Sequence, residues 1–262
     1  MSVFNYTQEG FLSALRSVGL REGDTVFTHS NIGYFGMPDS GAAADALEII
    51  LGGFQKAIGP EGTLIVPTFT YSFPKNEVFD PLTSPSACGA FSEKVRKHPA
   101  SRRSEDPFFS VAALGKKAGE LTAGVSDECF GEDSFWARFL AADGRICNLN
   151  FDAGSTFIHY VEKTLQAPYR QDRVFSGAVV KESAKIEKKV IFYSQDLAVP
   201  DTAASFELFH EAAKKIGIVY EARMGRGSIL RIDAKDTQEL IRRVLPKHPF
   251  FLIERGRGGP VP

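Results

Sequence analysis

The segment NLNFDAGSTFIHYVEKTL, residues 148–165, changes from the hydrophobic pattern of a strand to that of a helix. Its first residues suit a pleated surface, and Asp152, Ala153 and Gly154 predict a tight turn. From Ser155 onward, apolar residues recur at the spacing of an amphipathic helix. A strand that leads through a short turn into a helix is the building unit of α/β proteins, so this segment predicts that fold class.

The rest of the chain alternates in the same way on both sides of this segment. Helical spacing predicts further helices over residues 7–20, 42–59, 133–143, 205–217 and 236–245. β-Branched and aromatic runs predict strands over residues 24–30, 62–71, 108–115, 145–151, 218–223 and 227–234, and a strand pair over 173–183 and 185–195. We therefore expect a layered α/β/α fold with a central mixed sheet, in which Pro67 stops or bends one strand.

The length of 262 residues fits one domain, because no stretch has the composition of a linker. We expect residues 1–262 to form a single domain, with residues 171–262 as a smaller C-terminal α+β lobe of it. Residues 72–107 are rich in proline, serine and charge, and a loop of this length is more often functional than a passive connection.

The formal net charge of −1 provides no overall basic field that would draw the chain to nucleic acid or to an anionic membrane. No apolar run approaches the roughly 20 residues that span a bilayer, and the first residues do not have the pattern of a signal peptide. Three cysteines without a CxxC pair fit a reducing compartment, so the expected location is the cytoplasm.

A polar stripe surrounds one of the five histidines. On a helix, Ser155 and Thr156 would share a face with His159 and Glu162, because residues three or four apart are neighbours. A carboxylate beside an imidazole orients the ring and raises its basicity, which a general base requires. The plainer interpretation is a helix that carries a surface histidine whose ring nitrogens have ordinary hydrogen-bond partners and no catalytic role.

Two loops are further candidates for a site. The segment FTHSNIGYFG, residues 27–36, places His29 and Ser30 where a strand ends, the usual position of ligand sites in α/β sheets, although it is neither a GxGxxG nor a Walker A motif. The segment SRRSEDPFFSVAALG, residues 101–115, contains Arg103, which can bind phosphate. A GxSxG nucleophile elbow is absent. An HExxH motif is also absent, so we expect no metal.

Four ordered segments of the chain match the motifs of one family. They are FTHSN, GPEGTLIVPTFTYSF followed by EVFDP, RSEDPFFSVAALG, and DAGSTFIHYVE, with a weaker similarity in MGRGSILRIDAKD. From about Arg21 to Arg170 the chain thereby resembles the aminoglycoside 3-N-acetyltransferase family, also called the antibiotic N-acetyltransferase family. That family is distinct from the common GNAT acetyltransferase fold.

The resemblance implies direct transfer of an acetyl or other short acyl group from acyl-CoA to an amine, with no metal and no acyl-enzyme. His159 aligns with the family's catalytic histidine and becomes the general base, with Glu162 and Asp152 as the residues that orient it. The residues implied in binding of acetyl-CoA are His29, Ser30, Asn31, Thr68, Arg103 and Ser110. The residues implied on the acceptor side are Tyr71, Asp80, Asp106 and Ser155.

Two departures from the family motifs concern the acceptor. Asp106 stands where the family has a histidine, and residues 152–156 read DAGST in place of DSNTS. Because the net charge also shows no marked acidity, we expect a small-molecule amine other than the antibiotic, namely an amino sugar such as one linked to a nucleotide. The alternative acceptor is an aminoglycoside. No nucleic acid polymer or membrane is an expected partner, and assembly into a homo-oligomer is left open.

Two other classes of protein are alternatives to an acyltransferase. A non-catalytic α/β binding module could have kept the scaffold. Such a module would be expected to have lost the general base, but His159 is present. A hydrolase could use Ser30 or Ser155 activated by a histidine, but the chain lacks an elbow and an evident oxyanion loop.

Overall fold

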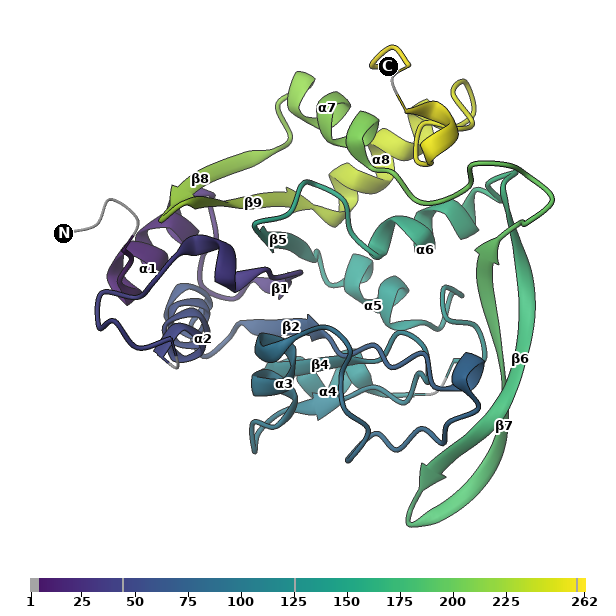
Figure 1. The fold of residues 1–262 in the computed structure, drawn as a ribbon, viewed down its shortest axis with the longest axis horizontal. Coiled ribbons are helices and arrows are strands. Elements are labelled where there is room, and N and C mark those ends of the chain that lie inside the picture. The colour runs from purple at the N-terminus through teal and green to yellow at the C-terminus, as the bar shows by residue number, and fades with distance from the viewer. Residues whose placement is uncertain (1–4, 44, 125, 258) are drawn as a thin grey trace.

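The computed structural model describes residues 5–43, 45–124, 126–257 and 259–262. A seven-stranded mixed sheet lies at its centre (Figure 1). In spatial order its strands are β3 (Arg102–Arg103), β4 (Val111–Gly115), β2 (Thr63–Pro67), β1 (Thr25–Phe27), β5 (Arg145–Leu149), β9 (Gly227–Asp233) and β8 (Tyr220–Met224). A separate two-stranded sheet is formed by β6 (Arg170–Lys181) and β7 (Ala184–Gln195).

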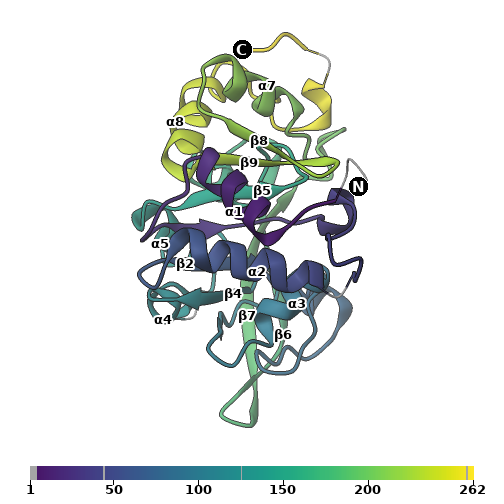
Figure 2. The same ribbon diagram turned by 90° about the vertical axis from the view of Figure 1, so that its left-hand side faces the viewer.

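Helices cover both faces of the central sheet, and Figure 2 shows α1 (Gln8–Ser17) and α2 (Asp45–Ile58) in front of it. One face carries α1, α2 and α3 (Ala90–Arg96). The other carries α4 (Ala118–Thr122), α5 (Phe135–Ala141), α6 (Phe157–Thr164), α7 (Glu207–Lys215) and α8 (Ala234–Val244). Short 3-10 helices lie at η1 (Ile32–Phe35), η2 (Phe73–Lys75) and η3 (Glu254–Gly256).

Alternating side chains of the strands divide the core between the two helical layers. In β1, Val26 packs with α1 and α2, whereas the next residue, Phe27, packs with α5. In β2, Leu64 and Val66 lie on the first side and Ile65 on the second. Successive residues of a strand point to opposite faces, so a strand covered on both sides reads as a continuous apolar run. The predicted α/β/α layers and the central mixed sheet are confirmed.

The three strands at the centre of the sheet point in the same direction. β1 pairs in parallel with β2 and with β5, whereas β3, β4, β8 and β9 join through antiparallel pairs. The carboxyl ends of β1, β2 and β5 therefore meet at one edge, where α/β sheets bind ligands. Asn150, directly after β5, and Tyr71, in the loop after β2, both have positive φ, of 59° and 53°. Both loops thus hold strained backbone at this edge.

The C-terminal third divides between the two sheets. β8 and β9 extend the central sheet, and α7 and α8 pack against its second face, whereas β6 and β7 project along one side of the molecule (Figure 1). The turn of this hairpin places Glu182 and Ser183 at φ 48° and 67°, as two-residue hairpin turns require. Residues 171–262, expected as one lobe, therefore contribute a separate hairpin and an integral part of the main layers.

Three short elements lie outside the predicted set. The expected loop over residues 72–107 contains α3 and the two-residue strand β3, and α4 follows β4. Segments of two to seven residues are too short to show a hydrophobic period. None of the helices that the structure describes is both long and apolar enough to cross a membrane.

Candidate active site

The loops after β1 and β5 run side by side. Ser30 forms a parallel bridge with Leu149, and the Asn31 amide donates to the Leu149 carbonyl at 2.9 Å. The loop that carries His29, Ser30 and Asn31 therefore borders the turn that leads to His159. The sequence predicts one crevice at this point if the two strands are close in the sheet, and β1 and β5 are direct neighbours.

The turn between β5 and α6 is fixed by Asn148, whose side chain is fully buried. Its Nδ2 donates to the carbonyls of Asp152 and Gly154 at 2.8 and 2.9 Å. Its Oδ1 accepts a hydrogen bond from the His29 amide at 3.3 Å. One side chain therefore holds both loops of the crevice. Sequence reasoning missed Asn148, for which the only signal is an amide inside an apolar strand.

The helix of His159 begins at Phe157, later than the sequence pattern predicts. Ser155 lies before it, is 2% exposed, and its Oγ accepts from the Phe157 amide at 3.3 Å. The Thr156 amide donates to His29 Nε2 at 3.3 Å. The first amides of a helix need acceptors from outside it, and these two contacts supply them. The expected polar face is therefore reduced to His159 and Glu162, and Ser155 serves the helix start.

Asp152 contacts the turn and not the histidine. Its Oδ1 accepts from the Gly154 amide at 2.8 Å, and its side chain is exposed. Among the described residues, no hydrogen bond joins Asp152 to His159. Of the two carboxylates expected to orient His159, Glu162 alone does so, because Asp152 is held in the turn that precedes the helix.

His159 and Glu162 form a close pair on one face of α6. Nδ1 of His159 lies 2.6 Å from Oε2 of Glu162. An ionised carboxylate can only accept, so Nδ1 carries the hydrogen and Nε2 keeps a free lone pair. The ring packs between Phe130 and Phe206 at centroid distances of 5.7 and 5.8 Å, and the side chain remains 17% exposed. The pair therefore leaves one basic nitrogen on a ring that is still partly exposed to solvent.

Two further residues contact the fully buried carboxylate of Glu162. The Tyr169 hydroxyl donates to Oε1 at 2.7 Å, and Nε of Arg170 lies 2.6 Å from Oε2. Burial alone would raise the pKa of Glu162, but the contacts with His159, Arg170 and Tyr169 outweigh it and lower that pKa. Sequence reasoning missed Tyr169 and Arg170, because their spacing from Glu162 follows no helical or strand period.

Burial lowers the pKa of both His29 and His159 and so favours their neutral forms. Burial, and then the Arg170 guanidinium, lower the pKa of His159 against the opposing effect of Glu162. Burial, and then the proximity of His159, lower the pKa of His29 to about 4. A neutral His29 can accept the Thr156 amide, and a neutral His159 can act as a base.

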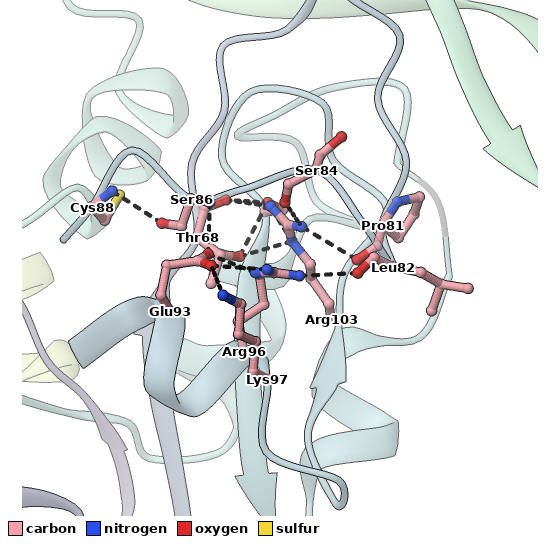
Figure 3. Close-up of polar contacts among 11 residues, drawn as sticks. Thr68, Pro81, Leu82, Ser84, Ser86, Cys88, Glu93, Arg96, Lys97 and Arg103 are labelled. Carbon is pink, nitrogen blue, oxygen red and sulfur yellow. Dashed lines mark hydrogen bonds and ion pairs between the residues drawn. The ribbon is translucent and has the colours of Figure 1, made fainter. Parts of the chain in front are cut away.

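Thr68, Arg103 and Ser110 bond to one another. Figure 3 shows Arg103 with Thr68 and the 72–107 loop residues Pro81 and Ser84. Thr68 and Ser110 are fully buried, with their hydroxyl oxygens 3.1 Å apart. Arg103 donates to both hydroxyls and to the carbonyls of Thr68, Pro81 and Ser84 at 2.7, 3.2 and 2.6 Å. These contacts join the 72–107 loop to the residues that follow β2 and precede β4, and the expected role of the three residues in CoA binding stays a prediction.

Tyr71 and Asp80, both expected on the acceptor side, differ in their contacts. Tyr71 is 37% exposed and packs edge-on against Phe69 and Phe109. Asp80 accepts from the Leu82 amide and the Thr83 hydroxyl, so it stabilises a turn of the loop. Tyr71 therefore remains available to a ligand, whereas Asp80 has a local structural partner.

Asp106 caps the segment that leads into β4. Its Oδ1 accepts from the amides of Phe108 and Phe109 at 2.7 and 3.0 Å. Burial raises the pKa of this carboxyl despite those bonds and the nearby Lys188. The carboxylate that replaces the family's histidine thus serves the backbone of its own turn.

An acidic pocket of about 680 Å³ adjoins the His159 pair. Phe130 lines this pocket and also packs against the His159 ring, and Lys163 of the lining follows His159 by one turn of α6. The lining contains one lysine and four carboxylates, those of Asp127, Glu128, Glu132 and Asp133. A chain with a net charge of −1 therefore concentrates negative charge beside its candidate base.

A second pocket, of about 340 Å³, lies on the other side of the turn after β5. Its lining includes Arg223, Arg226, Tyr34 and Phe151, together with the carboxylates of Asp152 and Glu221. Tyr34 is 63% exposed and Phe151 48% exposed, and Phe151 also packs against His29. This arginine pocket combines two cations and two aromatic rings, and one of those rings, Phe151, contacts His29.

No cluster of metal ligands accompanies these pockets in the described part of the chain. Cys129 and Cys147 are buried, and Cys88 is half-buried. Burial raises the pKa of Cys147 to about 12 and also raises that of Cys88. Thiols with raised pKa values are poor nucleophiles at neutral pH.

Comparison with known proteins identifies relatives over most of the chain. Residues 27–246 match the family model described as aminoglycoside 3-N-acetyltransferase. Aminoglycoside N(3)-acetyltransferase VII of Streptomyces paromomycinus is 27% identical over 94% of this chain and 92% of its own length. The crystal structure of aminoglycoside acetyltransferase AAC(3)-Xa has a TM-score of 0.81 at 25% identity, covering 93% of this chain and 94% of that chain.

A structure of AAC-IIIb in a binary complex with CoASH is similar in fold, with a TM-score of 0.77 at 20% identity over 91% of this chain and 97% of that chain. The family match begins at the last residue of β1 and includes the loop after it, β5 and α6, which carry the His159 site. The resemblance inferred from the motifs is confirmed. The chain belongs to the aminoglycoside 3-N-acetyltransferase family.

Proposed function

We propose that this protein transfers the acetyl group of acetyl-CoA directly to an amine of an aminoglycoside, with His159 as the general base. The observation that carries the proposal is the His159–Glu162 pair, which leaves Nε2 free to take a proton, and Phe130 packs against this ring while also lining an acidic pocket. Two findings support the reaction and the class of acceptor. The chain belongs to the family, and a relative along most of its length is named an aminoglycoside N(3)-acetyltransferase.

The proposed reaction requires removal of a proton from the amine. An ammonium group has no lone pair, and the nitrogen must lose its proton to attack the thioester carbonyl. The neutral amine, its ammonium proton lost to solvent, attacks the carbonyl, and His159 Nε2 accepts a second nitrogen proton as the C–N bond forms. As the C–S bond breaks, His159 passes this proton to the sulfur, and CoA leaves as its thiol. The products are the N-acetylated amine and CoA, with no covalent intermediate on the chain.

The acidic pocket favours an aminoglycoside over the nucleotide-linked amino sugar that the sequence led us to expect. Aminoglycosides are polycations, and the four carboxylates of the pocket would attract them. The diphosphate of a nucleotide sugar would be repelled by the same groups. The low net charge of the chain was a poor guide to the acceptor. Net charge sums over the whole chain, so it does not reveal a local cluster of carboxylates.

The arginine pocket suits the nucleotide end of CoA. Guanidinium groups of Arg223 and Arg226 can pair with phosphates, and the exposed ring of Tyr34 offers a surface for adenine. From there the pantetheine arm would pass His29 and Ser30 toward His159. The CoASH complex of a protein with the same fold supports a CoA site in this architecture.

Reversal of charge in the arginine pocket should weaken CoA binding. The double variant Arg223→Glu and Arg226→Glu removes two phosphate partners and adds two repulsive charges, so the Kd for CoA should rise by about tenfold or more. Isothermal titration measures this Kd. Arg242→Glu, at an exposed arginine of α8, is the matched control and should leave the Kd unchanged. Equal affinity in the double variant would place the nucleotide elsewhere.

Neutralisation of the acidic pocket should raise the KM for a polycationic acceptor. Glu132→Gln with Asp133→Asn removes two negative charges, and a tenfold rise in KM corresponds to about 1.4 kcal/mol. The kcat should change little, because neither residue contacts His159. Glu120→Gln, an exposed position on α4, is the control. A KM that stays constant in the double variant would remove this pocket from the acceptor site.

A panel of amines incubated with acetyl-CoA tests the function itself. Release of free thiol only with aminoglycosides supports the proposal. Thiol release without any amine would indicate a hydrolase, and no release with any amine would indicate a binding module. Equal kcat/KM for a nucleotide-linked amino sugar would contradict the acceptor assignment.

A further inference from the structure

Arg170 is a buried cation beside the candidate base that the proposed reaction does not use. It is the first residue of β6, and its side chain is 4% exposed. Its Nε lies 2.6 Å from Oε2 of Glu162, the same oxygen that Nδ1 of His159 contacts at 2.6 Å. A single carboxylate oxygen therefore faces a permanent cation on one side and the imidazole on the other.

This geometry favours one protonation state of the pair. An arginine stays charged at any physiological pH, so a protonated His159 would place a second positive charge against the same buried oxygen. A neutral His159 keeps its Nδ1 hydrogen bond to Glu162 and avoids that repulsion. A carboxylate by itself would do the opposite, because it stabilises a protonated imidazole.

We propose that Arg170 is a positioning residue that acts through Glu162, holding this carboxylate ionised and disfavouring the protonated form of His159, so that Nε2 stays free for the amine proton. The inference rests on the proposed function, in which His159 is the base. Tyr169 assists by donating its hydroxyl hydrogen to the second carboxylate oxygen at 2.7 Å. The base is thus an Arg170–Glu162–His159 chain rather than a histidine and a carboxylate alone.

The other groups that face His159 do not supply this effect. His29, from the end of β1, is uncharged at neutral pH, with a pKa lowered to about 4 by burial and by His159 itself. Phe130 and Phe206 pack against the ring without charge. Lys163, one turn further along α6, pairs with Asp172 at 2.6 Å.

The pH profile of kcat/KM for Arg170→Gln tests the proposal. Loss of the guanidinium should let the Glu162–His159 pair take up its proton more readily, whichever residue holds it, so the acid limb moves to higher pH. The rate should fall relative to wild type at pH 6 and stay close to it at pH 8. Arg170→Lys keeps the positive charge and should restore most of the wild-type profile. Arg173→Gln, at an exposed arginine of the same strand, is the control.

An NMR titration of the His159 ring provides a readout that needs no turnover. In the wild type, the midpoint should lie below the ordinary histidine value of 6.5 even though the ring contacts a carboxylate. A wild-type midpoint above 6.5, or an unchanged midpoint in a folded Arg170→Gln variant, would overturn the proposal. A uniform loss of rate at every pH would also overturn it, because a purely structural role predicts that result. Absence of acetyl transfer in the wild type would instead refute the proposed function and leave this titration valid.

Discussion

Replacement of His159 by alanine should lower kcat by about 10²–10⁴-fold while the fold and CoA binding persist. The imidazole supplies the free Nε2 lone pair, and Glu162 holds the other ring nitrogen at 2.6 Å. The helix should survive, because alanine has a higher helical propensity than histidine. The activity of the wild type should decline as the pH falls through the lowered pKa of His159, because the neutral form is the base.

The measurement is kcat at saturating acceptor and acetyl-CoA, with circular dichroism as the folding control. His98→Ala, beyond the end of α3, is the matched histidine control and should keep the wild-type rate. Glu162→Gln is a poor substitute for these variants, because it would leave Arg170 buried without its carboxylate and cost about 3–5 kcal/mol of stability. If folded His159→Ala keeps a kcat within a few-fold of wild type, His159 is not the general base and α6 is only a helix with a polar face.

Replacement of Arg103 by methionine should lower the free energy of unfolding by about 3 kcal/mol. The guanidinium donates to two buried hydroxyls and three carbonyls, and methionine would remove all five of these bonds. The carbonyls of Pro81 and Ser84 would then lose the arginine that binds them both. Beside it, Arg96 bonds to Glu93 and to the Leu82 carbonyl, so two arginines tie the same loop to β2, β4 and α3 (Figure 3). Burial lowers the pKa of Arg103 to about 10, which still leaves it charged at pH 7.

Urea denaturation followed by circular dichroism gives this free energy. Arg102→Met is the control, because Arg102 is the exposed neighbour in the same short strand and its change should stay within about 0.5 kcal/mol. Limited proteolysis should cut the 72–107 loop faster in Arg103→Met than in Arg102→Met. If Arg103→Met is as stable as wild type but binds CoA poorly, the residue belongs to the CoA site after all.

The sequence predicted the layers, because strands buried on both faces leave continuous apolar runs and amphipathic helices leave periodic apolar patterns. It failed at α3, α4 and β3, which are too short to show a period, and at the start of α6, where it assigned Ser155 to the helix. That start is set by His29, which accepts the Thr156 amide from a position 127 residues away in the chain.

The sequence by itself determined the α/β order, the family motifs and the pair of His159 and Glu162, because these depend on residues close together in the chain. Only the tertiary structure decided that Arg170 faces Glu162, that Thr68, Ser110 and Arg103 bond to one another, and that four carboxylates line one pocket. Local pattern records which face of an element is buried. Which charge meets which partner depends on how the elements pack, and packing brings together residues with no fixed spacing in the sequence.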